Sequence, residues 1–507
     1  MASQTKRHFN LFEENWIPVA NTGLVSLRQA FTSRALRSLG GNPVQKIAVL
    51  KLLLSIAHAA HTPANDNDWK KDGVDGMASR TLEYLESKRE LFWLFGDKPF
   101  LQMPIIEKAK KLNYGATQPS IASGNTTVLW QSQVEHSLSD AEKALLLVVL
   151  MGFATGGKKT DNSVVLTPGY DGKSKTGKPG SSLGYLGYLH SFILGESIQE
   201  TVWLNLLSRE SVASMKIFTG GIGVAPWDSM PAGEDDELAR SLKSSLMGRL
   251  VPLGRFILLA DEYLHYSEGI AHPGHDRGAF DPSISIDFNS KKPKALWADP
   301  EKRPWRQITA LLAFLSSKDI GFSCWQLRLC MRRAIDTTKR VGIWSAGLRV
   351  NNKSFGEQLI SGKDDFIESQ IYLDSEWLQG DRWFLSLQAE MAWVEELAKT
   401  IFAATRGYYT ALKADGKLHA GSASNLFWQR CERYFNDLCI ACNDATGRQL
   451  EILRPKLAAI VSEIYDAFCP NDTARQLEAW AQCRPFSSKL IPNHQHINEE
   501  SNGTSRS

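Results

Sequence analysis

The chain has 507 residues, of which 43% are hydrophobic and 22% are charged. These values are ordinary for a soluble globular protein, and they exclude a disordered or fibrous chain. The formal net charge is only +3, so overall electrostatics do not indicate a general nucleic-acid-binding protein. Any such activity has to reside in local segments.

The N-terminus and the cysteines bear on the cellular location. Residues 1–16 contain no apolar stretch of signal-peptide length, and the longest apolar run, Ala144 to Ala154, is about half as long as a membrane-spanning helix. The 7 cysteines show no regular spacing, which favours reduced thiols in the core over a disulfide framework. We therefore expect a cytoplasmic protein with no membrane segment.

The first part of the chain, to about residue 125, predicts a mixture of short strands and helices. A strand is expected at residues 16–19, a helix near residues 26–38, and a longer helix in VQKIAVLKLLLSIAHAA, where apolar residues recur at helical spacing. A polar helix is expected to follow and to end at Leu94-Phe95, before Gly96 and two prolines interrupt regular structure.

A further helix is predicted from Ser139 to Phe153, because Ser139 and Glu142 form a capping-box pattern ahead of an apolar stretch. Residues 158–187 are rich in glycine, lysine and serine. So long a loop inside a globular protein is usually functional or disordered. A helix in IQETVWLNLLS is expected to follow it.

The middle of the chain, roughly residues 215 to 375, mixes two kinds of element. Short strands are expected in RFILLA, SISIDF and SQIYL, and a helix is expected from Trp305 to Leu315. This part is therefore predicted to be α+β.

The composition changes near Trp377, after which four helical stretches are expected. They are separated by residues 414–416, 443–447 and 469–472, and apolar residues in the first stretch alternate in the pattern of an antiparallel bundle. Pro455 is expected in the first turn of the third stretch, where proline is tolerated. The sequence thus predicts an α+β fold with three parts: a large mixed N-terminal domain at residues 1–376, a C-terminal four-helix bundle at residues 377–489 and a disordered tail at residues 490–507.

GKSKTGK, residues 172–178, comes close to a phosphate-binding P-loop. Pro179, however, stands where the hydroxyl that binds magnesium must be, and no strand is predicted before the motif. The same glycines and lysines can instead meet a nucleic-acid backbone, because glycine allows close approach and lysine replaces condensed counterions. From the residues alone, a DNA-contacting loop and a plain solvent loop remain equally open.

Two other groups have the spacing of metal or redox motifs. Cys439 and Cys442 form a CxxC pair, but they fall in an amphipathic helix without a second pair, which favours core packing. His272, His275 and Asp276 are three potential ligands on a turn. A metal-dependent hydrolase that uses them is the alternative to a nucleic-acid-binding function.

GLRVNNKSFGEQLISGKDDFIES, residues 347–369, presents two amides and an ammonium, Asn351, Asn352 and Lys353, between glycines. No catalytic or metal motif explains this segment. Its chemistry alone does not reach a function.

Several stretches together resemble the CasA (Cse) family, the large subunit of the type I-E CRISPR surveillance complex Cascade. FNLFEENWIPV and VSLRQAF look like the opening of that family, KPFLQMP, ETVWLNLL and RPWRQI recur in the expected order, and residues 347–369 look like its central loop. The stretches span nearly the whole chain. Each motif is weak alone, but their order over a chain of matching length makes the resemblance specific.

The resemblance implies a non-catalytic subunit that recognises the protospacer-adjacent motif in double-stranded DNA, starts R-loop formation and helps recruit a helicase-nuclease. The family loop that corresponds to Asn351, Asn352 and Lys353 enters the minor groove and wedges apart the first base pair. Amides and an ammonium suit this groove, which presents mainly acceptors. Gly347 and Gly356 would let the loop enter a narrow groove.

The resemblance implies further contacts with nucleic acid. The family's glycine loop, which touches the same motif, falls in residues 167–180, its basic finger residue corresponds to Arg277, and its loop on the 5′ handle of the guide RNA falls in residues 125–133. The implied residues are Gly169, Gly172, Lys173 and Lys175 in the glycine loop, Arg277 in the finger, and Asn125 and Trp130 at the handle.

By the same resemblance, the bundle helps hold the displaced strand and contacts the small subunits, with Arg406, Arg430, Arg433 and Lys456 as basic candidates. The implied partners are the crRNA 5′ handle, double-stranded target DNA, the backbone, handle-binding and small subunits of Cascade, and the helicase-nuclease of the type I system. No cofactor is expected, and a cysteine cluster that some family members carry is absent here, which argues against zinc.

Overall fold

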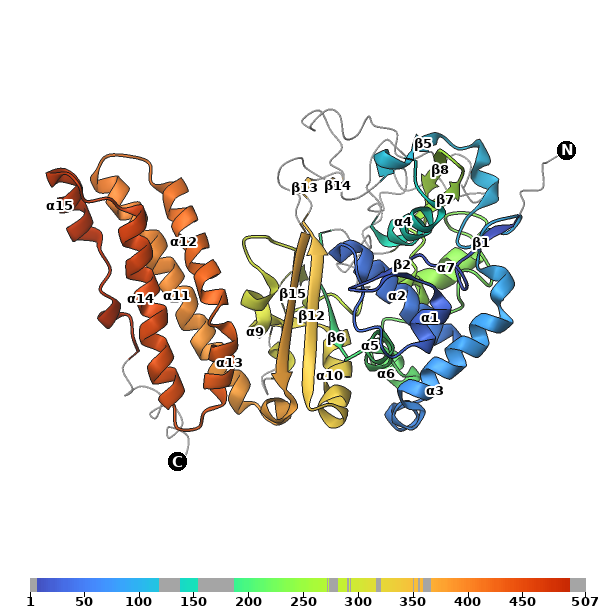
Figure 1. Cartoon of the computed structure of the whole chain (residues 1–507), viewed down its shortest axis with the longest axis horizontal. Coiled ribbons are helices and arrows are strands. Elements are labelled where there is room, and N and C mark those ends of the chain that lie inside the picture. Colours follow the sequence, from blue (N-terminus) through green and yellow to red (C-terminus); the bar gives the residue numbers. More distant parts are fainter. Residues whose placement is uncertain are drawn as a thin grey trace. The chain divides into compact units, whose positions relative to one another are not determined.

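The computed structural model describes residues 7–117, 137–153, 187–270, 272, 281–289, 291, 293–315, 321–349, 351–353, 356–358 and 366–492. The chain divides into two compact units, residues 1–314 with 318–376, and residues 315–317 with 377–507. The first unit combines helices with short sheets, and the second consists of helices in its described part (Figure 1). The predicted α+β class is therefore confirmed.

α2 (Pro43–Ala60) is the central helix of the first unit. Asn42 caps it, Gln45 completes a capping box and Pro43 occupies the first turn, three local signals that fix where the helix begins. Among the described residues it is the one helix long and apolar enough to cross a membrane, but most of its residues are buried inside the unit. That burial is the environment of a core helix.

The other helices of this unit are mostly short, and α3, α4, α5 and α8 pack against α2. Ser139 caps α4 as predicted: its hydroxyl accepts from the Glu142 amide at 3.3 Å, and the Glu142 carboxylate accepts from the Ser139 amide at 2.8 Å. The remaining bounds are α1 (Leu27–Thr32), α3 (Asp66–Ser87), α4 (Asp140–Gly152), α5 (Ile198–Asn205), α6 (Arg209–Ser214), α7 (Glu237–Lys243), α8 (Met247–Leu250), α9 (Ile308–Leu311) and α10 (Trp325–Thr337).

The central sheet is antiparallel and has the order β15-β12-β6. Its strands are β6 (His190–Leu194), β12 (Arg340–Leu348) and β15 (Phe366–Asp374). β12 lies in the middle and is buried from Val341 to Leu348. In the register, Ile343 faces both Ile371 and Ile193. The hydrogen bonds of β12 are therefore shared between its two neighbours.

The other sheets are small. Their bounds are β1 (His8–Asn10) with β4 (Trp93–Phe95); β2 (Ile17–Val19) with β3 (Gly23–Val25); β5 (Lys111–Asn113), β8 (Tyr263–Glu268) and β7 (Arg255–Leu259); β10 (Lys294–Ala295), β9 (Ile286–Asp287) and β11 (Phe322–Ser323); and β13 (Asn351–Lys353) with β14 (Gly356–Gln358).

Three predictions for the first unit are wrong. The helix expected near residues 26–38 ends at Thr32. The polar helix α3 ends at Ser87, and the residues expected at its end form β4, where Phe95 pairs with His8 of β1. The helix expected from Trp305 to Leu315 is broken into α9 and flanking 3₁₀ turns.

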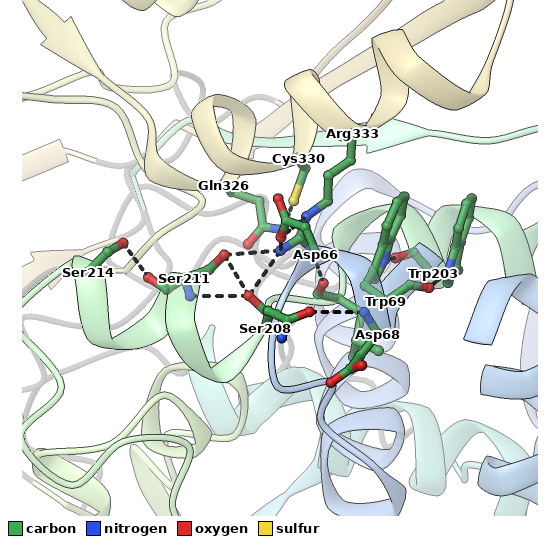
Figure 2. A network of polar contacts seen from close by, with 12 residues as sticks. Asp66, Asp68, Trp69, Trp203, Ser208, Ser211, Ser214, Gln326, Cys330 and Arg333 are labelled. Carbon is green, nitrogen blue, oxygen red and sulfur yellow. Dashed lines mark hydrogen bonds and ion pairs between the residues drawn. The ribbon is translucent and has the colours of Figure 1, made fainter. Parts of the chain in front are cut away.

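A buried guanidinium holds α10 against three other helices (Figure 2). Arg333 donates to the Leu206 carbonyl at 2.7 Å, to the Asp66 carboxylate at 2.9 Å, and to the hydroxyls of Ser208 and Ser211 at 3.2 and 3.0 Å. These acceptors lie in or next to α3, α5 and α6. Because the guanidinium is buried, each bond is hard to replace with water.

Two tryptophans complete this network. The rings of Trp69 and Trp203 stack with centroids 4.0 Å apart, and each indole N–H donates to the backbone carbonyl of the other residue, at 2.8 and 3.2 Å. The Arg333 guanidinium lies 5.1 Å from the Trp69 ring centroid. The pair therefore joins α3 to α5 directly and supplies an aromatic face for the cation.

The second unit contains α11 (Arg382–Ala411), α12 (Lys417–Glu432), α13 (Phe435–Asn443), α14 (Arg448–Phe468) and α15 (Ala474–Cys483). The predicted breaks fall between helices, but the second predicted stretch is divided in two at Arg433-Tyr434. Pro455 lies well inside α14 rather than in its first turn, because the helix already begins at Arg448. Pro455 has no N–H with which to continue the hydrogen bonds of the helix.

The core of the second unit holds one buried ion pair and most of the cysteines. Arg454 of α14 and Glu390 of α11 pair with side chains 7% and 5% exposed. Cys439 and Cys442 of the CxxC pair are both buried in α13. Core packing of this pair, as expected from its helical spacing, is therefore confirmed.

The first prediction concerns Arg333. Replacing it by methionine should lower the free energy of unfolding of the first unit by about 2–4 kcal/mol, because buried carbonyl and hydroxyl acceptors lose their donor. Urea unfolding measures this change. Arg332→Met is the matched control, since Arg332 is the exposed neighbour on α10, and it should stay within about 0.5 kcal/mol of the wild type. Equal losses in both variants would contradict a special role for the network.

The second prediction concerns thiol reactivity. All 7 cysteines are free, and Cys483 is the one that is not fully buried. Burial raises the pKa of Cys324, Cys330, Cys442 and Cys469 to about 12. Because the thiolate is the reactive form, an alkylating reagent followed by mass spectrometry should label the native protein slowly and mainly at Cys483. Fast native labelling of Cys439 or Cys442 would show that the CxxC pair is accessible.

Candidate nucleic-acid interface

Asn351, Asn352 and Lys353 are the predicted DNA contacts that fall within the described residues. Together they form β13, which pairs antiparallel with β14, so that Asn352 faces Glu357 across the hairpin. The predicted contacts of the glycine loop, the finger and the handle loop lie outside the described residues, and so do two residues of the alternative metal site: Gly169, Gly172, Lys173, Lys175, Arg277, Asn125 and Trp130, and His275 and Asp276.

The hairpin stands on the long strands of the central sheet. β12 ends at Leu348 and β15 begins at Phe366, and these two residues face each other in the register. β13 and β14 follow at this end of the strands (Figure 1). The two supporting strands each have 9 residues, and one of them is buried along nearly its whole length. The sheet is therefore a firm base for the hairpin.

Gly347 was expected to give the loop freedom to enter a narrow groove, and the structure gives it another role. It is a buried residue of β12, inside the sheet. A Cβ atom at this position would lie 2.5 Å from the Tyr188 carbonyl oxygen and 2.9 Å from the Ala298 Cβ. The absence of a side chain at Gly347 thus serves close packing at the base of the hairpin.

The two described residues that flank residues 154–186, the segment of the predicted glycine loop, lie at this sheet. Phe153, before the segment, has its ring centroid 6.1 Å from that of His190 in β6. Gly187, after the segment, donates its N–H to the Leu348 carbonyl of β12 at 3.0 Å. Both flanks of the segment are therefore fixed close to the base of the hairpin.

The segment that contains Arg277 also ends at β6. The Ser191 N–H donates to the Ser283 carbonyl at 2.8 Å, and His190 Nδ1 lies 2.9 Å from the Ser283 hydroxyl oxygen. Ile284 forms a backbone bridge with His190. The chain on the C-terminal side of residues 273–280 therefore lies against the same strand.

A buried ion pair fixes this chain further. Asp281 pairs with Lys51 of α2, and its other carboxylate oxygen accepts from the amide and the hydroxyl of Ser283 at 2.9 and 2.7 Å. Burial by itself would raise the pKa of Asp281, but the Lys51 ammonium and the Ser283 donors outweigh burial and lower the pKa below its ordinary value. The carboxylate is therefore ionised and ties residue 281 to the core helix.

His272 has a structural role on the N-terminal side of the same segment. It is buried, with Nδ1 2.7 Å from a guanidinium nitrogen of Arg249 and Nε2 2.7 Å from the Pro252 carbonyl oxygen. A guanidinium only donates and a carbonyl only accepts, so the ring is neutral and carries its proton on Nε2. Both nitrogens are occupied, which removes His272 from the alternative metal site.

Metal ligands do not gather elsewhere in the part of the chain that the structure describes. Within those residues no group of three or more histidine, cysteine, aspartate and glutamate side chains could hold a metal ion. The described side chains therefore give the alternative hydrolase no site.

A cleft of about 900 Å³ lies on the central sheet toward the start of β12. Lys46 and Glu368 form an ion pair in its wall at 2.7 Å, and the Trp344 indole donates to the same carboxylate at 2.9 Å. Its other charged lining residues are Arg37, Lys339, Arg340, Glu196 and Glu200. Because its lining mixes carboxylates with cations, the cleft does not offer a uniformly positive surface for a phosphate backbone.

The basic candidates of the second unit lie at its surface, but one is already paired. Arg430, which is partly buried, lies 2.8 Å from the Glu463 carboxylate across α12 and α14. Arg406, Arg433 and Lys456 are exposed on the helices or at their ends. These three positions are accessible, and the predicted contact of the basic candidates with the displaced strand stays a prediction.

Sequence reasoning missed the contact that joins these segments: it gave Gly347 another role and did not single out Gly187, Tyr188 or Ala298. Gly187, Tyr188, Ala298 and Gly347 meet through contacts between distant parts of the chain. No local pattern reveals such contacts. The one signal in the sequence was the presence of glycine at positions 187 and 347, because a glycine can indicate close approach of two chain segments or an unusual backbone angle.

Comparison with known proteins identifies the family. The family model of the CRISPR-associated protein Cse1 matches residues 10–467. CasA/Cse1 of Thermus thermophilus is 30% identical over 165 residues, and the match spans 29% of this chain and 32% of that relative. The chain thus matches about a third of that relative's length at this level of identity.

Solved structures share the fold over nearly the full length. CasA of Thermus thermophilus has a TM-score of 0.72 at 19% identity, covering 96% of this chain and 100% of that chain. Cse1 of Thermobifida fusca has a TM-score of 0.73 at 18% identity, covering 96% and 97%. A chain of a CRISPR RNA-guided surveillance complex has a TM-score of 0.68 at 15% identity, covering 96% and 100%. Because the family model covers most of the sequence, the resemblance found in the sequence is confirmed, and the chain belongs to the Cse1 family of CRISPR-associated proteins.

Proposed function

We propose that this protein is a non-catalytic large subunit of a type I-E CRISPR surveillance complex, that it recognises the protospacer-adjacent motif in double-stranded DNA, and that it initiates R-loop formation. The observation that carries this proposal is the β13–β14 hairpin, in which Asn351, Asn352 and Lys353 follow the buried central strand of a three-stranded sheet. Family membership and a fold shared with a chain of an RNA-guided surveillance complex support it.

The chemistry of β13 suits the minor groove of DNA. The groove presents acceptors at every base pair and one donor at guanine, so an amide can donate or accept there while an ammonium meets an acceptor or a nearby phosphate. Contacts of this kind distinguish bases only coarsely. A subunit that reads DNA in this way accepts several related motifs rather than one sequence.

The base of the hairpin suits a wedge. Unstacking two neighbouring base pairs costs on the order of a few kcal/mol. A hairpin that is inserted between them therefore needs a rigid support. β12 supplies it through hydrogen bonds to a strand on each side. Beyond β12, Arg349 lies 3.9 Å from Asp299, an ion pair between the hairpin's base and the segment after β10.

The proposal extends to the partners. In this scheme protein reads the motif while base pairing with the guide RNA reads the target sequence. The near-neutral net charge of +3 fits a subunit whose surface mostly meets other proteins. We assign it the crRNA 5′ handle, target DNA, the other Cascade subunits and the helicase-nuclease as partners, and the cytoplasm as its location.

The third prediction tests the hairpin. In a complex reconstituted with guide RNA, the Asn351→Ala/Asn352→Ala/Lys353→Ala variant should lose at least about tenfold of the wild-type preference for a motif-bearing duplex over a duplex without the motif, because several groove contacts of about 1–3 kcal/mol each disappear. Equilibrium binding to the two duplexes measures this preference. The variant should bind a duplex with its first target base pairs already opened as tightly as the wild type does.

Lys70→Ala serves as the control, since it removes the same charge from an exposed position of α3 to which no DNA contact is assigned. It should keep the wild-type preference. A triple variant that assembles and still discriminates as well as the wild type would refute the assignment of this hairpin, and residues 167–180 would become the next segment to test.

A further inference from the structure

Two glycines meet where the hairpin leaves the central sheet. The N–H of Gly187 donates to the carbonyl of Leu348 at 3.0 Å, and the carbonyl of Gly187 accepts from the N–H of Ala298 at 2.8 Å. Gly347, the neighbour of Leu348 in β12, packs against Tyr188 and Ala298 from the other side. We call Gly187, Tyr188, Ala298, Gly347 and Leu348 the glycine junction.

A side chain is unfavourable at both glycines, for different reasons. A Cβ at Gly347 would lie 2.5 Å from the Tyr188 carbonyl oxygen, and that oxygen belongs to the main chain, so it cannot rotate away. Gly187 has a φ of 84°, in the left-handed region that residues with a Cβ rarely adopt. The two positions therefore allow the closest approach of the two chain segments.

The junction is anchored on a small apolar cluster. Tyr188 is buried and packs with Ile284, Ile286 and Ala295. Its ring stacks on that of Trp297 with centroids 4.7 Å apart, and the two residues also form a backbone bridge. Because this packing holds Tyr188 in place, a side chain introduced at the junction should displace the end of β12 or residue 187 rather than Tyr188.

The geometry points to Gly347 as a positioning residue for motif recognition. It fixes the base of the β13–β14 hairpin against Gly187, the first described residue after the segment that contains the predicted glycine loop. This inference rests on the proposed function, and it adds that the position of the hairpin's base determines discrimination of the motif.

The physical consequence of a side chain at this position can be stated. Restoring ordinary contact between a new Cβ and the Tyr188 carbonyl requires a separation roughly 1 Å larger than the present geometry allows. A displacement of that size at a recognition site is enough to cost tenfold or more in a reaction that needs exact registration. The loss should appear in discrimination between duplexes, and general affinity for DNA should change much less.

The fourth prediction uses Gly347→Ala in the guide-loaded complex. The variant should assemble and should lose at least about tenfold of the preference for a motif-bearing duplex. Binding to a duplex whose first target base pairs are already opened should be close to wild type, because that substrate does not need a correctly placed wedge. A purely structural defect would weaken binding to both substrates.

Gly342→Ala is the matched control. It lies in the same strand, and its new Cβ would also be too close to neighbours, at 2.8 Å from the Leu194 Cβ and 2.9 Å from a ring carbon of Tyr372. Those neighbours are side chains at the end of β12 remote from the hairpin. Gly342→Ala should therefore keep the motif preference even where thermal unfolding shows that it is destabilised as much as Gly347→Ala.

Trp297→Leu covers the case in which Gly347→Ala does not assemble. It removes the ring that holds Tyr188 and introduces no steric conflict, so it should reduce the motif preference in the same direction by a smaller factor. An assembled Gly347→Ala complex that discriminates like the wild type overturns the inference. If Gly347→Ala does not assemble, wild-type discrimination by Trp297→Leu overturns it.

The triple alanine variant of the hairpin separates this inference from the proposed function. If the triple variant retains the motif preference, the proposed function is wrong and the inference falls with it. If the triple variant loses the preference while Gly347→Ala keeps it, the hairpin is the sensor and only the positioning role of Gly347 is wrong.

Discussion

The antiparallel pairing of β6 with β12 is the constraint on which the candidate interface depends. β12 is a central strand, so its position is fixed from both sides. β6 is also tied on its outer side: the N–H groups of Leu189 and Ser191 donate to the carbonyls of Leu296 and Ser283 at 3.0 and 2.8 Å. These outer bonds bring the chain around residues 281–298 to the same strand. Residues from several segments that lie far apart in the sequence are thus hydrogen-bonded to one sheet.

The helices hold this sheet through a chain of polar contacts. The Asn205 side chain accepts from the Ile193 N–H at 3.0 Å and donates to the Ile193 carbonyl at 2.6 Å, which completes the outer edge of β6. Gln326 of α10 in turn donates to the Asn205 carbonyl at 2.8 Å. Arg333, on the same helix, binds α3 and α6. Buried polar groups of this kind specify one arrangement, because any other leaves donors or acceptors unpaired.

Sequence reasoning succeeded where the determining signals are local. The capping box of Ser139 and Glu142 and the apolar periodicity of α2 act within a few residues, so they predicted these helices well. Sequence reasoning failed where residues far away in the sequence determine the local structure. Residues 93–95 form a strand because they pair with β1, and Gly347 is a glycine because Tyr188 and Ala298 occupy the space of its Cβ. The assignment of Asn351, Asn352 and Lys353 came from family resemblance, since their chemistry alone did not reach a function.

Under the proposed function, a near-neutral subunit recognises DNA by position more than by charge. Nonspecific attraction to the duplex grows with the number of phosphates that cations neutralise, and a net charge of +3 over 507 residues supplies little of it. Discrimination then depends on whether a few donors reach the groove together. Hydrogen bonds lose most of their strength when donor and acceptor are badly aligned, so the position of the hairpin matters more than the count of its lysines. A buried strand with a tightly packed glycine one residue before its end suits this requirement, because close packing restricts movement where the hairpin leaves the sheet.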